Sequence, residues 1–113
     1  VNRSPVSGTV YRIEYKPGAF KPAMKTEASE LNESNTLYMD SDQGRVTVRQ
    51  ISGLVARRIV CAAEGGQNLE LGQKFGMIKF GSRTELYLPP DSEICVTLGE
   101  KVKAGTSIVA RFQ

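Results

Sequence analysis

The string Lys79-Phe80-Gly81-Ser82-Arg83-Thr84-Glu85 holds the residues of this 113-residue chain whose types and order best suit chemistry. The Ser82 hydroxyl is a candidate nucleophile, although an unassisted hydroxyl is a weak one. The chain contains no histidine, which excludes an internal Ser-His-Asp or Cys-His nucleophile and a histidine-based zinc site. A Gly-Ser pair between an apolar run and a strand is also ordinary turn chemistry. Considered locally, the string leaves a turn and a reactive serine both open.

The two cysteines do not suggest a metal site or a disulfide framework. Cys61 and Cys95 stand in apolar strings, and neither has a second cysteine or a histidine at ligand spacing. We therefore expect both to be buried as small hydrophobic side chains. This cysteine usage fits a cytosolic compartment best.

Short stretches of alternating apolar and polar residues predict strands. They cover residues 6–13, 45–51, 85–88, 93–97 and 107–112. Glycine and proline punctuate the chain between them, at spacings typical of an all-β sandwich or barrel. Residues 16–35 form a polar segment that predicts one long loop, with a short helix candidate at residues 26–32. We predict a single all-β domain over residues 1–113, a barrel-sandwich hybrid with one long polar loop.

A weak internal repeat lies in the second half of the chain. Gly66-x-x-Leu69-x-x-Gly72 is echoed by Gly99-x-x-Val102-x-x-Gly105. Each copy resembles the turn of biotinyl and lipoyl carrier domains and of barrel-sandwich hybrid folds, although turn chemistry alone explains the pattern equally well. A carrier would also need a lysine at an exposed hairpin tip, and Lys79 lies inside an apolar string.

The charge is small and unevenly distributed. A net charge of +3 is far below the basic footprint of a nucleic-acid binder, so we expect no nucleic-acid partner. Residues 1–25 are mainly basic, and residues 26–44 hold only acidic charges. A solvated surface explains most such blocks, and an anionic phosphate or membrane partner is the alternative. The two blocks would also allow charge-complementary pairing in a homo-oligomer.

Several strings resemble, in the same order, the small phosphatidylserine decarboxylases of bacteria and archaea. The resemblance covers nearly the whole chain, which makes it far more specific than a lone Gly-Ser pair. The strings are 1–8 (VNRSPVSG), 28–35 (ASELNESN), 51–61 (ISGLVARRIVC), 72–83 (GQKFGMIKFGSR) and 87–89 (YLP).

The resemblance implies a pyruvoyl cofactor made from Ser82. Its hydroxyl would attack the carbonyl of Gly81, where a Cβ would crowd the intermediate, and replace the peptide bond by an ester. Loss of the Ser82 α-proton would expel the Gly81 carboxylate and leave a dehydroalanine, which would tautomerise and hydrolyse to a pyruvoyl group with release of ammonia. Residues 1–81 would become the β chain and residues 82–113 the α chain, packed as one domain. The pyruvoyl group would then accept the electrons released when phosphatidylserine loses carbon dioxide to give phosphatidylethanolamine.

Other residues are candidates for substrate binding. Arg57 and Arg58 could hold a phosphate, although adjacent strand residues face opposite ways, and a solvated or salt-bridged pair fits as well. Arg83 could steady a substrate anion or lie in solvent. Phe80 belongs to an apolar string that could line an acyl-chain groove, with core packing the simpler interpretation. Arg3 and Asn35 are included because they match the family's strings.

The family also uses an aspartate and a histidine upstream of the region seen here. Small members carry that histidine immediately before a string like Val1-Asn2-Arg3, so we expect this chain to be truncated at its N-terminus. Two outcomes stay open, a chain that cleaves itself and one that folds unprocessed and inactive.

Two hypotheses for function follow. The first is a phosphatidylserine decarboxylase that acts peripherally on the cytoplasmic side of the cell membrane. The alternative is a non-enzymatic barrel-sandwich module, similar to biotinyl or lipoyl domains, that binds a partner or carries a group.

Overall fold

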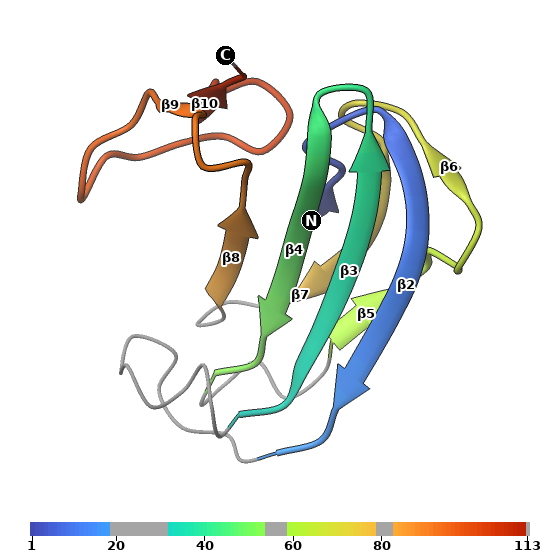
Figure 1. The fold of residues 1–113 in the computed structure, drawn as a ribbon. Coiled ribbons are helices and arrows are strands. Elements are labelled where there is room, and N and C mark those ends of the chain that lie inside the picture. The colour runs from blue at the N-terminus through green and yellow to red at the C-terminus, as the bar shows by residue number, and fades with distance from the viewer. Residues whose placement is uncertain (19–31, 54–58, 79–82, 113) are drawn as a thin grey trace.

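The computed structural model describes residues 1–18, 32–53, 59–78 and 83–112, and within them every regular element is a strand (Figure 1). The expected all-β class is therefore confirmed. The strands form sheets of five, three and two members, and all paired strands run antiparallel. None of the described residues forms a helix long and apolar enough to cross a membrane.

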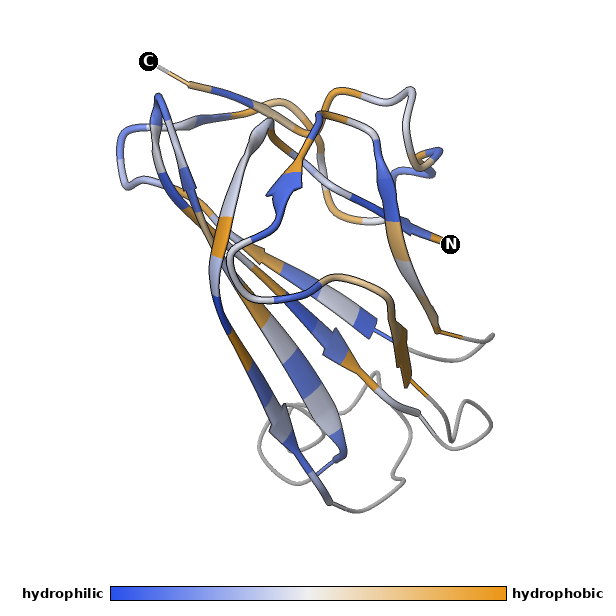
Figure 2. Ribbon diagram, turned by 90° about the vertical axis from the view of Figure 1, so that its right-hand side faces the viewer, coloured by the Kyte–Doolittle hydropathy of each residue, from blue (hydrophilic) through white to orange (hydrophobic). Residues whose placement is uncertain are grey.

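The main sheet is a curled half-barrel with the strand order β6-β2-β3-β4-β8. Its members are β2 (Gly8–Lys16), β3 (Ser34–Ser41), β4 (Gly44–Ile51), β6 (Asn68–Leu69) and β8 (Arg83–Tyr87). Hydropathy alternates along the long strands, as Figure 2 shows, because successive side chains point to opposite faces. The inner face supplies most of the buried core, namely Val10, Leu37, Met39, Val46, Val48 and Leu69.

A second sheet covers the concave side of the first. It consists of β1 (Asn2–Arg3), β7 (Lys74–Ile78) and β5 (Ile59–Cys61), with β7 in the middle. Phe75 of β7 is 1% exposed and packs into the core cluster of the main sheet. A Cβ on Gly76 would overlap the carbonyl oxygen of Val60, so only glycine allows β5 and β7 to approach this closely.

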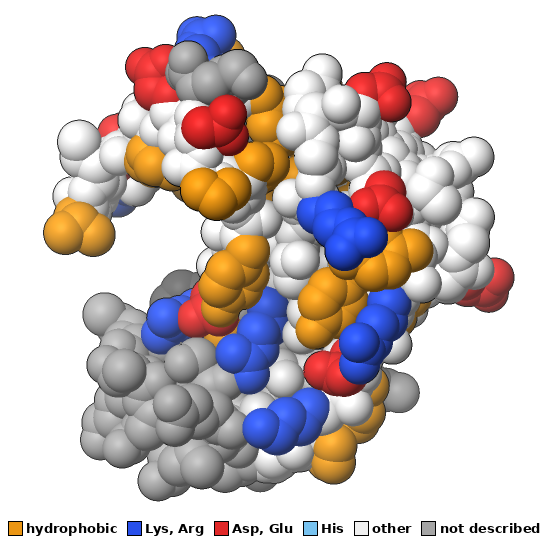
Figure 3. Space-filling model, in the orientation of Figure 1, with side chains coloured by type: hydrophobic (Ala, Val, Ile, Leu, Met, Phe, Trp, Pro, Cys, Tyr) orange, Lys and Arg blue, Asp and Glu red, His pale blue; other side chains and the backbone are white. Residues whose placement is uncertain are grey.

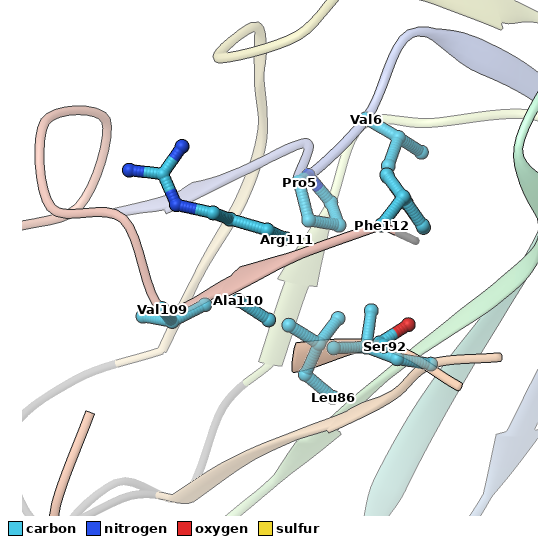
Figure 4. Close-up of a pocket in the computed structure, with 9 residues that line it drawn as sticks. Pro5, Val6, Leu86, Ser92, Val109, Ala110, Arg111 and Phe112 are labelled. Carbon is cyan, nitrogen blue, oxygen red and sulfur yellow. The ribbon is translucent and has the colours of Figure 1, made fainter. Parts of the chain in front are cut away.

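The C-terminal arm leaves the main sheet after β8 and forms the short pair β9 (Glu93–Ile94) and β10 (Ala110–Arg111). Most of its side chains are exposed, including Leu98, Val102 and Ile108. The arm and the half-barrel enclose a small apolar cavity of about 50 Å³ (Figure 4). Its lining comes from both parts of the chain, namely Pro5, Val6, Leu86, Leu88, Ser92, Val109, Ala110, Arg111 and Phe112.

The repeated glycines of the second half all occupy left-handed turns. Gly66, Gly72, Gly99 and Gly105 have φ angles of 87°, 81°, 83° and 86°, a conformation that other residues adopt only with strain. In the first three turns the side chain after the glycine accepts a hydrogen bond from the backbone N–H three residues earlier. The repeat predicted from the sequence is therefore a repeat of turn geometry.

Several expectations need correction. The whole polar segment 16–35 was predicted to be a loop. Its last two residues, Ser34 and Asn35, instead belong to β3 and are buried. The helix candidate at residues 26–32 lies outside the described residues except for Asn32, which forms an isolated bridge. Cys95 is exposed because it stands on the arm, whereas Cys61 is half-buried against the core.

Candidate active site

One end of the main sheet carries the residues that flank the Gly-Ser motif. The strand register places Lys16, Ser34, Ile51 and Arg83 in one row across β2, β3, β4 and β8. Gly81, Ser82 and Phe80, together with Arg57 and Arg58, lie outside the described residues. Since Ser82 is bonded directly to Arg83, this row is the anchor of the candidate site.

Glu85 organises the outer face of β8. Its carboxylate accepts a hydrogen bond from the Tyr87 hydroxyl at 2.6 Å and forms ion pairs with Arg83 Nη2 at 2.7 Å and Arg49 Nη1 at 3.6 Å. The Glu85 side chain is only 14% exposed, so these partners compensate its partial desolvation. The hydrogen bond to Glu85, followed by burial and the negative charge of Glu85, raises the pKa of Tyr87, while Arg49 opposes the shift. Arg83, which follows Ser82 in the chain, is thus held by the carboxylate of Glu85, and this carboxylate also contacts Tyr87 and Arg49.

A chain of side-chain amides crosses the inner side of the same region. Asn35 Nδ2 donates to Gln50 Oε1 at 3.1 Å, and Gln50 Nε2 donates to Asn2 Oδ1 at 2.9 Å. Asn2 Nδ2 in turn lies 3.4 Å from Thr84 Oγ1. Gln50 is 1% exposed, and its Nε2 also reaches the carbonyl oxygen of Val60 at 3.3 Å. The chain of bonds therefore runs from the buried interior to the second residue after Ser82.

A further buried polar group secures the ends of β3 and β4. Asn32 Nδ2 donates to the carbonyl oxygen of Ser52 at 2.7 Å, and the backbone N–H of Ser52 donates to the carbonyl oxygen of Glu33 at 3.0 Å. Asn32 and Ser52 are fully buried. Buried amides satisfied in this way fix the backbone where these strands begin and end.

The structure brings together only some of the residues expected from the sequence. Asn35 lies in the amide chain and Arg83 in the Glu85 cluster. Arg3 lies elsewhere, because its Nη1 donates to the carbonyl oxygen of Gly72 at 3.0 Å and its side chain covers Gly105, where an added Cβ would lie 2.8 Å from Arg3 Cδ. In this position Arg3 joins the two copies of the turn repeat. No group of potential metal ligands occurs among the described residues.

Sequence reasoning missed Gln50, Asn2, Glu85 and Arg49. The sequence did contain a signal for Gln50. Every second side chain of β4 points inward, as Val46 and Val48 do, and Gln50 is a polar residue at the next inward position, where an apolar one is expected. No comparable signal marks Asn2, since its role depends on a contact between residues 48 positions apart.

The half-barrel and its amide chain define an all-β domain whose buried polar groups converge on the strand after a Gly-Ser motif. The family model described as phosphatidylserine decarboxylase matches residues 1–110. The chain therefore belongs to the phosphatidylserine decarboxylase family. This result confirms the resemblance found in the sequence.

Curated relatives agree with the family model. A protein named phosphatidylserine decarboxylase proenzyme from Gluconacetobacter diazotrophicus is 52% identical over 113 residues, which cover 99% of this chain and 50% of that protein. Proteins with the same name from Ehrlichia canis and Pelodictyon phaeoclathratiforme are 51% and 44% identical, covering 97% and 99% of this chain and 50% and 53% of their own length. The chain spans about half the length of the curated relatives it matches. No solved structure gives a significant match.

Proposed function

We propose that this chain is the part of a phosphatidylserine decarboxylase proenzyme that cleaves itself at Gly81-Ser82 and then carries a pyruvoyl group derived from Ser82. The family membership supports the reaction class, and the pairing of β8 with β4 fits two pieces that stay together after a cut. The family membership also favours this function over a non-enzymatic carrier module.

The observation that carries the proposal is the pairing of β8. This strand begins one residue after Ser82 and pairs with β4 from Ile51↔Arg83 to Thr47↔Tyr87. A cut between residues 81 and 82 would therefore leave the first strand of the C-terminal piece paired at the edge of a sheet whose other strands come from the N-terminal piece. The two pieces, residues 1–81 and 82–113, would remain one folded unit.

The flanking residues fit a cofactor at position 82. A pyruvoyl group supplies an electron sink for the loss of carbon dioxide. Glu85 fixes the Arg83 guanidinium, and the pairing of Arg83 with Ile51 holds the backbone to which the group would be attached. Asn2 and Gln50 keep polar atoms in fixed directions on the inner side, so little reorganisation is needed when a substrate binds.

The substrate would be phosphatidylserine, and the protein would act peripherally at the cytoplasmic face of the membrane. Arg83 would face the anionic end of the substrate, with Arg57, Arg58, Phe80 and Asn35 as further candidates for contact. The upstream aspartate and histidine implied by the family would activate Ser82. A protein that includes this upstream segment is therefore the form to test.

The test compares Ser82→Ala with Ser92→Ala in that longer protein. Ser92 is a suitable control because it lies in the same C-terminal piece and its buried hydroxyl makes no hydrogen bond. Ser82→Ala should abolish cleavage and the formation of phosphatidylethanolamine, while Ser92→Ala should retain both. Decarboxylation by the Ser82→Ala protein would refute the assignment.

A further inference from the structure

On the outer face of the main sheet, hydrophobic and basic side chains gather over β2, β3 and β4, with acidic side chains among them (Figure 3). At the upper end of this face the Arg45 guanidinium lies 5.2 Å from the centre of the Tyr11 ring. The Tyr11 ring lies 6.0 Å from that of Tyr38, which in turn stacks with Arg12 at 5.3 Å. The surface continues across β3 and β4 to Arg49 and Tyr87 on the other side of a shared groove. We call this surface of the main sheet, which extends from Tyr11, Arg45, Tyr38 and Arg12 to Arg49 and Tyr87, the outer face.

An irregularity in β2 builds the tyrosine end of this surface. The register between β2 and β3 shifts between Val10 and Arg12, so Tyr11 is an extra residue in the pairing. Val10 is fully buried on the inner side, and Ile13 packs partly against the same core. Tyr11 and Arg12 are consequently both exposed, where an unbroken strand would expose only one of them.

Basic side chains outnumber acidic ones on the strands of the outer face. Each carboxylate already has a basic neighbour, since Glu14 pairs with Arg12, Asp40 with Arg45, and Glu85 with Arg83 and Arg49. With Lys16 included, the strands present two more cations than carboxylates. Among the residues that the structure describes, the strands of this face therefore carry a positive net charge, which attracts anions.

The groove in the middle of the outer face offers hydroxyl groups between these charges. It has a volume of about 300 Å³ and lies over β2, β3, β4 and β8. Its lining residues are Glu14, Lys16, Ser34, Thr36, Tyr38, Thr47, Arg49 and Tyr87. Hydroxyl donors beside guanidinium and ammonium groups suit the oxygen atoms of a phosphate ester. Tyrosine rings are also typical of surfaces that sit at the headgroup level of a bilayer.

We propose that the outer face docks on an anionic phospholipid bilayer, with the groove receiving lipid phosphate groups and the tyrosines lying at the headgroup level. The basic excess supplies the attraction, and the hydroxyl-lined groove gives it a defined location. This inference rests on the proposed action at a membrane and deepens it by naming the surface that makes the contact. Docking needs neither cleavage at Ser82 nor turnover, so a failure to bind vesicles and a failure to react are distinguishable.

Sedimentation with vesicles tests the docking surface. Phosphatidylglycerol vesicles are the probe, because they are anionic and lack the serine headgroup, and phosphatidylcholine vesicles are the neutral comparison. Each basic residue near an anionic surface strengthens binding about fivefold. The double variant Lys16→Gln/Arg45→Gln should therefore lose about 25-fold in apparent affinity for phosphatidylglycerol vesicles.

The matched control is Lys101→Gln/Lys103→Gln, which removes the same charge from exposed positions on the C-terminal arm. It should leave the affinity within about twofold of the parent, because these lysines lie off the outer face and interactions are screened over about 10 Å in 0.1 M salt. Equal losses in both variants, or no binding by the parent, would overturn the proposal. Formation of a dimer that the Lys16→Gln/Arg45→Gln change disrupts, without vesicle binding, would assign the face to a second copy instead.

A fluorescence measurement gives an independent result that does not depend on charge removal. The chain contains no tryptophan, so Tyr11→Trp introduces a single reporter on the outer face. Its emission should shift to shorter wavelength on phosphatidylglycerol vesicles, whereas Leu98→Trp on the arm should not respond. A shift for Leu98→Trp alone would show that the arm meets the bilayer and would refute the assignment.

Discussion

Gln50 of β4 donates from its side-chain Nε2 to Asn2 Oδ1 at 2.9 Å, which ties the first strand of the chain to the interior of the main sheet. This bond is the middle one of three side-chain hydrogen bonds that connect Asn35, Gln50, Asn2 and Thr84. Thr84 lies two residues after Ser82 in the chain. A fully buried amide can be tolerated here because both of its polar atoms have partners.

Replacing Gln50 by leucine should strongly destabilise the domain. Leucine fills a similar volume but leaves Asn35 Nδ2 and Asn2 Oδ1 without their present partner. A buried polar group left unsatisfied costs about 1–3 kcal/mol, so we expect the free energy of unfolding to fall by about 2–3 kcal/mol. Urea unfolding followed by circular dichroism measures the loss. Gln43→Leu, in the exposed turn between β3 and β4, is the control and should change stability by less than about 0.5 kcal/mol.

Gly76→Ala should be harmful although the side chain it adds is a single methyl group. The new Cβ would overlap the Val60 carbonyl oxygen and lie 2.9 Å from Gln50 Nε2, so β5 and the amide chain would both have to move. Overpacking of this kind costs about 1–3 kcal/mol. Gly65→Ala is the matched comparison, because nothing lies within 4 Å of a Cβ at that position. Equal thermal midpoints for the two variants would contradict the close approach of β5 and β7.

The hydrogen bond from Tyr87 to Glu85 predicts a loss of stability at high pH. Because the folded state raises the pKa of Tyr87 above the ordinary value of about 10, its contribution is fully present below that pH and is lost as the pH rises through the folded-state pKa. Tyr87→Phe should lower stability at pH 7 by about 0.5 kcal/mol, since the side chain is partly exposed. The variant should also show a shallower decline above pH 10. An unchanged slope would argue against the bond.

The two thiols should react at different rates. Cys95 is exposed on the arm, whereas Cys61 is half-buried between β7 and the core. In the native protein a thiol reagent should modify Cys95 first and Cys61 only slowly, as peptide mass mapping of partly labelled protein would reveal. Cys61→Ser and Cys95→Ser identify which phase belongs to which residue. Fast labelling of Cys61 would contradict its packing against the core.

Much of the fold could be predicted from hydrophobic periodicity, and the failures have physical reasons. The predicted stretches 45–51 and 85–88 correspond to β4 and β8, whose faces differ clearly in polarity. β3 was missed because it begins with Ser34, Asn35 and Thr36, which look like loop residues. Their burial is explained by partners on other strands, and such partners are invisible in one sequence.

The candidate site, like the fold, has some features that the sequence could predict and others that it could not. The Gly-Ser motif could be proposed from the sequence because the chemistry expected of it depends on adjacent residues, and its assignment stays a prediction. Arg83, Glu85 and Arg49 form a cluster because β8 pairs with β4 in one register, and a shift of one residue would turn Arg49 to the opposite face. The role of Arg3 at Gly72 and Gly105 likewise depends on how the turn repeat folds back on β1.

The most direct test of the central claim is the intact mass of this chain and of a version extended upstream to include the expected histidine and aspartate. The account predicts that the extended protein yields two pieces divided between Gly81 and Ser82, that the C-terminal piece carries a pyruvoyl group in place of an N-terminal serine, and that the pieces stay associated. A single uncleaved mass for the folded extended protein would contradict self-cleavage at Ser82 and would favour a binding module.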